Sequence, residues 1–450
     1  MTARLLMIAL DGADGRLLDA ASADGAAPNL ATLRARGAAK RLSPPPGLTD
    51  DALWASFQYG VELGEHGRYN NLVRLDDGRW GAPQLNELDR EAFWDGLAAQ
   101  GLRVAVLDVP KCRPPRPING VHLTDWLVHG RAFSEPLSHP PSLAAEVLAR
   151  FGPAPPSRCG YHHPNLTDDG VGEAVRDLAN SVAKKRAAGL ACLEAEPWDL
   201  FIIGFKEMHC CCHTFWDFAD PDHPDHDAAR TARLGDPVRA ILKDIDEAVG
   251  DLAAAAGPTA QIVVFSTSDF EPNGSLMGLL PKIIVRLNKQ LGRSGWRCQM
   301  VPYHDSMGAL RVLADRRIGD GSEPCASAKP AVVDEIETLL GELVDAETGT
   351  RVISSFTRPS AQFQGARADS LPDLLLHYRS GAFPCAAASP RLGRLEAEQA
   401  RMRPGNHAPG GILITAGEAA CAAAARVDEL ADLGAAAAII LTDARQPTTF

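Results

Sequence analysis

Short apolar runs alternate along the chain with longer segments in which apolar residues recur at helical spacing. Each run ends at turn-forming or polar residues, which is typical of strands buried in a parallel sheet. We expect such strands at Arg4–Leu10, Val104–Val109, Leu200–Phe205, Ile262–Phe265 and Ile412–Thr415. Helices are expected between them, at Pro28–Gly37, Asp51–Tyr59, Phe93–Gln100, Leu143–Arg150, Gly172–Leu190 and Val238–Ala256. The alternation predicts an α/β fold with a mostly parallel central sheet and helices on both faces.

One segment departs from this alternation. Residues 279–371 show no regular succession of strand and helix patterns. The chain has 450 residues, which exceeds a typical domain and leaves room for an insertion. We therefore predict a single α/β domain over residues 1–450, with 279–371 as an inserted cap.

Polar residues directly follow three of the predicted strands. Asp11 follows the first strand, Lys206–His213 follows the strand that ends at Phe205, and Ser266–Asn273 follows the strand that ends at Phe265. In such sheets functional side chains collect beyond the carboxyl ends of the strands. We therefore expect these three segments to form a site at one edge of the sheet.

Two histidines in the second of these segments, His209 and His213, lie four residues apart. On a helix this spacing places both imidazoles on one face, with Cβ atoms about 5–6 Å apart, which suits two ligands of one metal ion. His407 lies in the glycine-rich stretch Gly405–Gly411, where the backbone rather than burial would hold it. Each feature alone also fits a structural histidine. Imidazole ligands favour Zn²⁺, Fe²⁺, Ni²⁺ or Cu²⁺ over Mg²⁺ or Ca²⁺.

Thr49 and Asp50 come just before the helix expected at Asp51–Tyr59. A Thr or Asp at this point commonly caps the helix. A helix N-terminus is also where an anionic phosphoryl group binds and where a nucleophile can be presented to it. Both interpretations stay open from the residues alone.

The composition of the chain limits the classes of partner that it is expected to bind. The formal net charge of −12 disfavours nucleic acid and anionic membrane surfaces as partners. No apolar run approaches the ~20 residues of a membrane span, and the first residues lack a signal-peptide pattern. Of the ten cysteines, Cys210–Cys212 are consecutive, so their side chains cannot all face one metal ion. We expect a cytoplasmic protein without a disulfide framework that acts on a small anionic substrate.

Several short motifs, in this order along the chain, resemble the alkaline phosphatase superfamily. The residues that carry the resemblance are Leu10-Asp11-Gly12, Pro28-Asn29-Leu30, Trp54, Ser56, Gly60, Glu65-His66-Gly67, Phe93-Trp94-Asp95, Asp108-Val109-Pro110, Asn119-Gly120, Asp125-Trp126, His209 to Trp216, Leu371-Pro372-Asp373 and His407 to Gly417. They are similar to the branch of type I phosphodiesterases and nucleotide pyrophosphatases, which includes phosphohydrolase/phosphomutase-like members. The resemblance covers nearly the whole chain as short islands.

The resemblance implies the alkaline-phosphatase-like fold and a two-metal hydrolase of phosphate or sulfate esters. One ion would be held by His209, His213 and His407. The second would be held by Asp11, by a Thr or Ser nucleophile and by an Asp-His pair after a later strand. Thr49 matches the nucleophile, although counting back from Gly60 without a gap leads to Asp50.

The chain departs from this pattern at the Asp-His pair, where Thr267 and Ser268 stand. Neither replaces a carboxylate or an imidazole at a Zn²⁺ site. Asp269 or Glu271 would serve only if the loop shifted. His209 also stands where the family has Asp. We therefore predict one divalent ion, Zn²⁺ by ligand type, at the three-histidine site and a degraded second site.

The predicted function is a metal-dependent hydrolase of a phosphate or sulfate mono- or diester. Three histidines and one open position are the ligand set that lowers the pKa of bound water to about 7, so one ion suffices for such chemistry. The alternatives are a mononuclear three-histidine enzyme with other chemistry and a non-catalytic family member. Arg68, Arg401 and Arg403 lie next to motifs and are either anion-binding residues or solvated surface charges.

Overall fold

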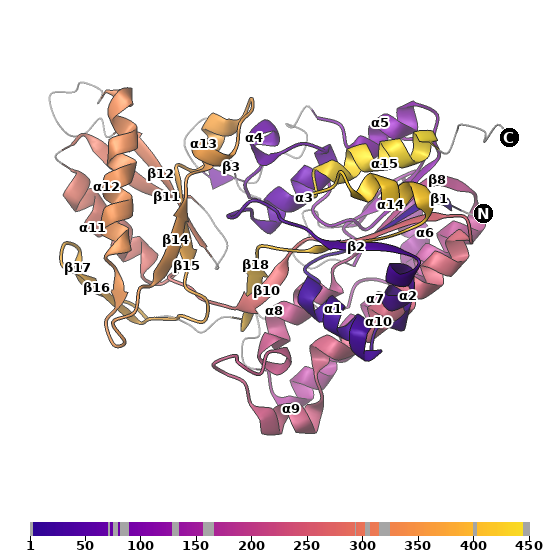
Figure 1. The fold of residues 1–450 in the computed structure, drawn as a ribbon, viewed down its shortest axis with the longest axis horizontal. Coiled ribbons are helices and arrows are strands. Elements are labelled where there is room, and N and C mark those ends of the chain that lie inside the picture. The colour runs from indigo at the N-terminus through magenta and orange to yellow at the C-terminus, as the bar shows by residue number, and fades with distance from the viewer. Residues whose placement is uncertain are drawn as a thin grey trace.

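An eight-stranded sheet forms the centre of the computed structural model, with the strand order β2-β19-β9-β1-β8-β5-β6-β7 (Figure 1). The structure describes residues 3–70, 73–74, 80–81, 90–127, 135–155, 166–292, 294–301, 307–314, 325–398 and 403–443. The strands of the sheet are β1 (Ala3–Leu10), β2 (Gly37–Arg41), β5 (Val104–Leu107), β6 (Gly120–Thr124), β7 (Leu137–His139), β8 (Trp198–Phe205), β9 (Gln261–Ser266) and β19 (Ile412–Ala416).

The middle of this sheet is parallel. Strands β9, β1, β8, β5 and β6 all run in one direction. At one edge β7 is antiparallel to β6, and at the other edge β19 is antiparallel to both β9 and β2. The mostly parallel sheet expected from the apolar runs is therefore confirmed. The strand expected at Ile412–Thr415 is present, but it runs against its neighbours.

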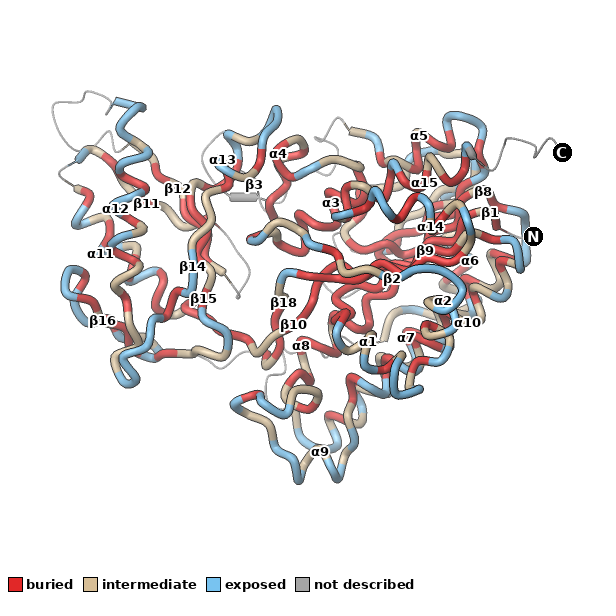
Figure 2. The backbone as a smooth tube through the Cα atoms, in the orientation of Figure 1, coloured by how far each residue is buried: buried red, intermediate tan, exposed pale blue. Residues whose placement is uncertain are grey.

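Alternate side chains of the central strand β1 enter two separate cores. Leu6 and Ile8 belong to one core, and Leu5 and Met7 belong to the other, as the period of two along a strand requires. The first core lies under α1 (Gly15–Asp24), α2 (Pro28–Ala35), α6 (Ser142–Phe151), α7 (Asp168–Ala195), α8 (Glu207–Ala219) and α10 (Pro237–Ala256). The second lies under α3 (Asp50–Tyr59), α5 (Phe93–Ala99), α14 (Glu418–Ala424) and α15 (Asp432–Asp443). Figure 2 shows the buried strands between helices whose outer sides are exposed.

A second sheet explains why residues 279–371 depart from the alternation. It is antiparallel, with the order β11-β12-β15-β14, and it stands apart from the large sheet (Figure 1). Its strands are β11 (Trp296–Val301), β12 (Met307–Ala314), β14 (Ile353–Thr357) and β15 (Leu374–Tyr378). The helices α11 (Leu280–Leu291) and α12 (Lys329–Gly341) belong to the same region. A smaller sheet of β13 (Val344–Asp345), β16 (Ala386–Ser389) and β17 (Gly393–Glu396) adjoins it. These elements share a hydrophobic core of their own.

Two features connect the second sheet to the first. A small apolar cluster joins Ala52 and Tyr69, near α3, to Ala309 of β12 and Leu375 of β15. The antiparallel pair β10 (Asp269–Pro272) and β18 (Gly405–Ala408) also lies between the two sheets (Figure 1). The remaining short elements are β3 (Val73–Arg74), β4 (Trp80–Gly81), α4 (Leu63–His66), α9 (Ala228–Leu234) and α13 (Pro359–Gln362).

Within the described residues, none of the helices combines the length and the apolar character needed to cross a bilayer. The cysteines in the described part of the chain form no disulfide, and Cys159 lies outside it. Cys211 and Cys212 are fully buried in the core under α8. Their burial raises the pKa of both thiols, so they are packing residues there.

Candidate active site

Three imidazole rings meet where β8 passes into α8. The helix starts at Glu207 and carries His209 and His213 one turn apart, both buried. His407 lies on β18, and its ring centroid is 4.8 Å from that of His209 and 4.7 Å from that of His213. The three residues taken from separate motifs thus form one group whose ligand atoms all lie within 4.8 Å of one another.

The three rings have the properties of neutral metal ligands. Burial lowers the pKa of all three imidazoles, to about 3 for His407. His213 donates from Nδ1 to the carbonyl oxygen of Gly405 at 2.7 Å, which leaves a lone pair on its Nε2. Two nitrogens on a tetrahedral Zn²⁺ would lie about 3.3 Å apart, and Nε2 of His213 lies 3.1 Å from Nε2 of His407. The residues therefore fit one ion of this kind.

Asp11 lies at the end of β1, beside His209. Its Oδ1 accepts hydrogen bonds from Trp54 Nε1 at 3.0 Å and from Thr267 Oγ1 at 3.2 Å. Its Oδ2 has no hydrogen bond and lies 3.3 Å from Nδ1 of His209. The next residue, Gly12, has φ +60, and a Cβ there would lie 3.0 Å from Cα of His209. A glycine after Asp11 therefore lets the strand end pass close to α8.

Thr49 is the N-cap residue of α3. Its Oγ1 accepts a hydrogen bond from the amide of Ala52 at 3.1 Å and donates one to the carbonyl oxygen of Tyr69. Both bonds hold the start of the helix, as the capping interpretation requires. A nucleophilic role for Thr49 would require its hydroxyl to give up the bond to Tyr69.

Asp50, the first residue of α3, forms a second group with Asp11 and His209. Their ligand atoms lie within 4.8 Å of one another. Oδ2 of Asp50 forms an ion pair with Nζ of Lys111 at 2.9 Å, whereas Oδ1 is buried without a hydrogen bond. Burial, the largest single effect, raises the pKa of Asp50, but the surrounding positive charges, led by that of Lys111, together outweigh it and hold the pKa well below its ordinary value. Burial and the charge of Asp50 raise the pKa of Asp11 to about 7.

The loop after β9 contributes hydroxyl groups next to the clustered ligands. Thr267 donates to Asp11, and Ser268 Oγ lies 2.7 Å from Nδ1 of His407. Thr267 and Ser268 therefore lie next to Asp11 and His407, at the position where the family has an Asp-His pair. They supply hydrogen bonds there instead of a negative charge.

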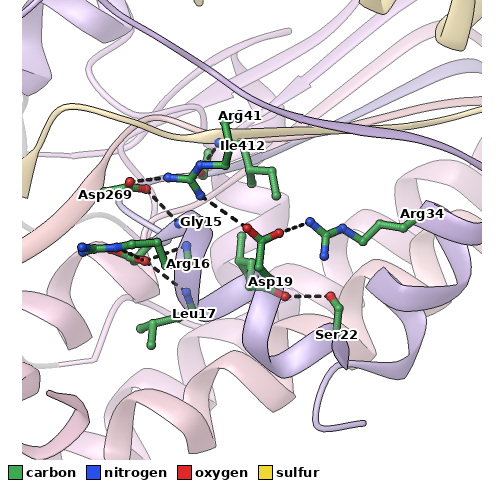
Figure 3. A network of polar contacts seen from close by, with 12 residues as sticks. Gly15, Arg16, Leu17, Asp19, Ser22, Arg34, Arg41, Asp269 and Ile412 are labelled. Atoms are coloured by element: carbon green, nitrogen blue, oxygen red, sulfur yellow. Dashed lines mark hydrogen bonds and ion pairs between the residues drawn. The ribbon is translucent and has the colours of Figure 1, made fainter. Parts of the chain in front are cut away.

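Asp269 turns away from this cluster. Its carboxylate accepts from the amide of Gly15 at 3.0 Å and forms an ion pair with Arg41 (Figure 3). On its other side Arg41 lies 4.0 Å from Asp19. Within the described residues, the groups that could hold a metal ion include neither Asp269 nor Glu271. The loop shift that would bring either into the site is absent there.

Four cationic side chains lie near the clustered residues or the carboxylate next to them, and one of them, Lys111, has no distinguishing pattern in the sequence. Arg68 and Arg403 were candidates, and both are almost fully buried rather than solvated. Arg401 lies outside the described residues. Lys206 begins one of the three segments expected at the site, whereas Lys111 was not expected there, because a lysine after a strand is indistinguishable in sequence from a surface charge. Charge from Lys206 lowers the pKa of both clustered carboxyls.

A cavity of about 380 Å³ opens beside these groups. Asp50, Ser268 and His407 line one of its walls, and Ser354 and His377 of the second sheet line another. His407 therefore brings the edge of the three-histidine group to a space that the second sheet helps to enclose. This volume lies within the ordinary range of small-molecule sites.

The fold and the clustered ligands define the class of protein. A mostly parallel sheet with helices on both faces, a second sheet beside it, and His and Asp ligands at the carboxyl edge make this an alkaline-phosphatase-like α/β protein. Residues 5–391 match the family described as type I phosphodiesterase / nucleotide pyrophosphatase, and the chain belongs to this family. Membership supports assignment to the phosphoester hydrolases.

One solved structure supports the fold, and a second is a weaker likeness. Phosphonoacetate hydrolase from Sinorhizobium meliloti 1021, in complex with phosphonoformate, is 15% identical with a TM-score of 0.58, and the match covers 97% of this chain and 96% of that chain. Human ectonucleotide pyrophosphatase / phosphodiesterase 5 is 12% identical with a TM-score of 0.49, over 92% of this chain and 88% of that chain. No curated protein sequence matches the chain.

Proposed function

We propose that the chain is a metal-dependent hydrolase of a small phosphate ester, with one divalent ion bound by His209, His213 and His407. The observation that carries the proposal is the convergence of three neutral imidazoles, of which that of His407 lines a cavity together with Asp50. Zn²⁺ is the ion that this ligand set favours among those common in hydrolases.

An ion at this site supplies a Lewis acid for an ester oxygen. Thr49 and Asp50 both line the cavity, but the Thr49 hydroxyl is held in the helix cap, whereas the Asp50 carboxylate is grouped with Asp11 and His209; Asp50 is therefore the proposed nucleophile. An oxygen of Asp50 forms a bond to phosphorus, and the bond from phosphorus to the leaving oxygen breaks. The leaving group departs with the electron pair and takes a proton from solvent. Water then attacks phosphorus and releases phosphate and the Asp50 carboxylate.

Metal quantification on the purified protein, followed by a panel of aryl phosphate monoesters, diesters and an aryl sulfate, tests this proposal. Phosphonoacetate belongs in the panel because a protein of the same fold hydrolyses it. His213→Ala should lose both the ion and the turnover. The matched control His226→Ala changes a histidine whose Nδ1 bonds only a local carbonyl, that of Asp217, so it should keep both.

Full turnover in His213→Ala would overturn the proposal. One bound ion without turnover on any ester would favour a mononuclear enzyme with other chemistry. A protein that binds no ion and does not respond to a chelator would favour a non-catalytic family member.

A further inference from the structure

The carboxylates beside the three-histidine site already have cationic partners. Nζ of Lys111 lies 2.9 Å from Asp50 Oδ2 and 3.0 Å from Asp51 Oδ1, and Arg68 lies 4.0 Å from the same atom of Asp51. Lys206 is almost fully buried, and its charge lowers the pKa of both Asp11 and Asp50. Three buried carboxylates thus face three cations, namely Asp11, Asp50 and Asp51 with Lys111, Lys206 and Arg68.

The backbone that presents Lys111 adopts an unfavourable conformation. Asp108 has φ +51 and Lys111 has φ +55, which residues other than glycine rarely adopt. The carboxylate of Asp108 accepts hydrogen bonds from the amides of Trp126 at 2.8 Å and Leu127 at 3.0 Å. Conformations of this kind persist only where the surrounding structure holds them, and they cluster at functional sites. The surrounding structure therefore holds the turn after β5 in a conformation that places the Lys111 ammonium group beside Asp50.

The ligands of a second ion do not fit here. Thr267 and Ser268 add hydroxyls in place of an Asp-His pair, and a dication beside Asp50 would meet the ammonium of Lys111 at close range. In a buried site that extra positive charge would stay uncompensated. A further ion at Asp11 and Asp50 is therefore disfavoured by the residues that surround it.

We propose that Lys111 takes the place of the second divalent ion, so that its ammonium supplies the positive charge beside the three-histidine centre. The proposal rests on the proposed function, because it assumes that the first ion is bound by the histidines. Removal of the ammonium should open the position to a cation. Asp11 Oδ2 and Asp50 Oδ1 are buried without a hydrogen bond, Asp50 Oδ2 would lose its partner with the ammonium, and His209 lies within reach of them.

The test is the number of Zn²⁺ or Mn²⁺ ions per chain, measured by elemental analysis after equilibrium dialysis. We expect one ion in the wild type, two in Lys111→Met and one in Lys111→Met/Asp50→Asn. Lys111→Arg retains the charge and should stay at one. Lys184→Met, which changes a lysine bonded only to the carbonyl of Pro153, should also stay at one.

The proposal is overturned if Lys111→Met folds and still binds one ion, or if the wild type binds an ion that survives His213→Ala and is lost in Asp50→Asn. If Lys111→Met does not fold by circular dichroism, the wild type decides, since a single ion lost in His213→Ala supports the proposal. A wild type without any ion refutes the three-histidine centre. If the wild type binds no ion but Lys111→Met binds one, and Lys111→Met/Asp50→Asn binds none, the role of Lys111 is still supported.

Discussion

Lys185 is the buried cation whose removal should damage the fold most. It lies on α7 with 1% of its side chain exposed, and its Nζ is 3.1 Å from Asp108 Oδ2 and 3.3 Å from Glu207 Oε1. It also donates to the carbonyl oxygen of Gly204 at 2.9 Å. These partners belong to the ends of β5 and β8 and to the first residue of α8. Lys185 therefore joins the segments on which Lys111 and the histidine helix depend.

Lys185→Met keeps most of the side-chain length and removes the charge. Two carboxylates then remain buried without their cation, and such a change costs about 3–5 kcal/mol of unfolding free energy at neutral pH. Burial already raises the pKa of Glu207, and without Lys185 that rise must grow. Because the folded variant then binds protons more readily than its unfolded chain, acid stabilises it relative to the wild type. The deficit should narrow as pH falls from 7 to 4.

The measurement is denaturant unfolding of both proteins at pH 7 and pH 4, followed by tryptophan fluorescence and circular dichroism. Lys184→Met, the neighbouring lysine on the same helix, should change stability by no more than about 0.5 kcal/mol. Lys185→Met/Glu207→Gln should recover part of the loss, because one of the stranded charges is removed. A deficit below about 1 kcal/mol, or one that does not change with pH, would refute the reasoning.

Three further predictions concern the cap residue, a buried histidine and the ion. Thr49→Ala loses the hydrogen bond to Ala52 and should cost about 0.5–2 kcal/mol of stability while it retains turnover. Asp50→Asn should fold normally and lose turnover on aryl phosphates. If instead Thr49→Ala loses turnover and Asp50→Asn retains it, Thr49 is the nucleophile. Burial lowers the pKa of His122 to about 3, so the wild type should lose stability as pH falls below about 6.5. His122→Phe should avoid about 3 kcal/mol of that loss at pH 4, and equal losses in urea unfolding would contradict it. A chelator should lower the Tm of the wild type but not that of His213→Ala, since only a bound ion stabilises the folded state.

Five strands of the large sheet, namely β1, β5, β8, β9 and β19, could be predicted because buried strands are continuous apolar runs. The strands β2, β6 and β7 were not predicted; β2, for example, reads Gly-Ala-Ala-Lys-Arg and is largely exposed. Strand direction could not, since the apolar pattern of Ile412–Ala416 is the same whether β19 runs with or against β9. The second sheet was expected only as an irregular segment. Its register depends on contacts between strands far apart in the chain, such as β12 with β15, and a local pattern contains no information about them.

At the site, too, features set by local sequence could be predicted, whereas features set by contacts between distant segments could not. His209 and His213 could be found because helical spacing alone makes them neighbours. The choice between Thr49 and Asp50 could not be made, because both precede the helix and only the fold shows which side chain joins Asp11 and His209. Lys111 was out of reach because its role depends on a left-handed backbone and on carboxylates from a distant helix.

The order of strands also bears on how the protein is made. The edge strand β2, residues 37–41, pairs with β19, residues 412–416, and β19 separates it from β9. During synthesis β2 therefore cannot pair with β19 until almost all of the residues that separate the two strands have been made. His407 comes only a few residues ahead of that partner, so the metal site is completed at the same late stage. A ribosome-bound intermediate that ends before β18 should hold α8 in place and yet retain no tightly bound zinc.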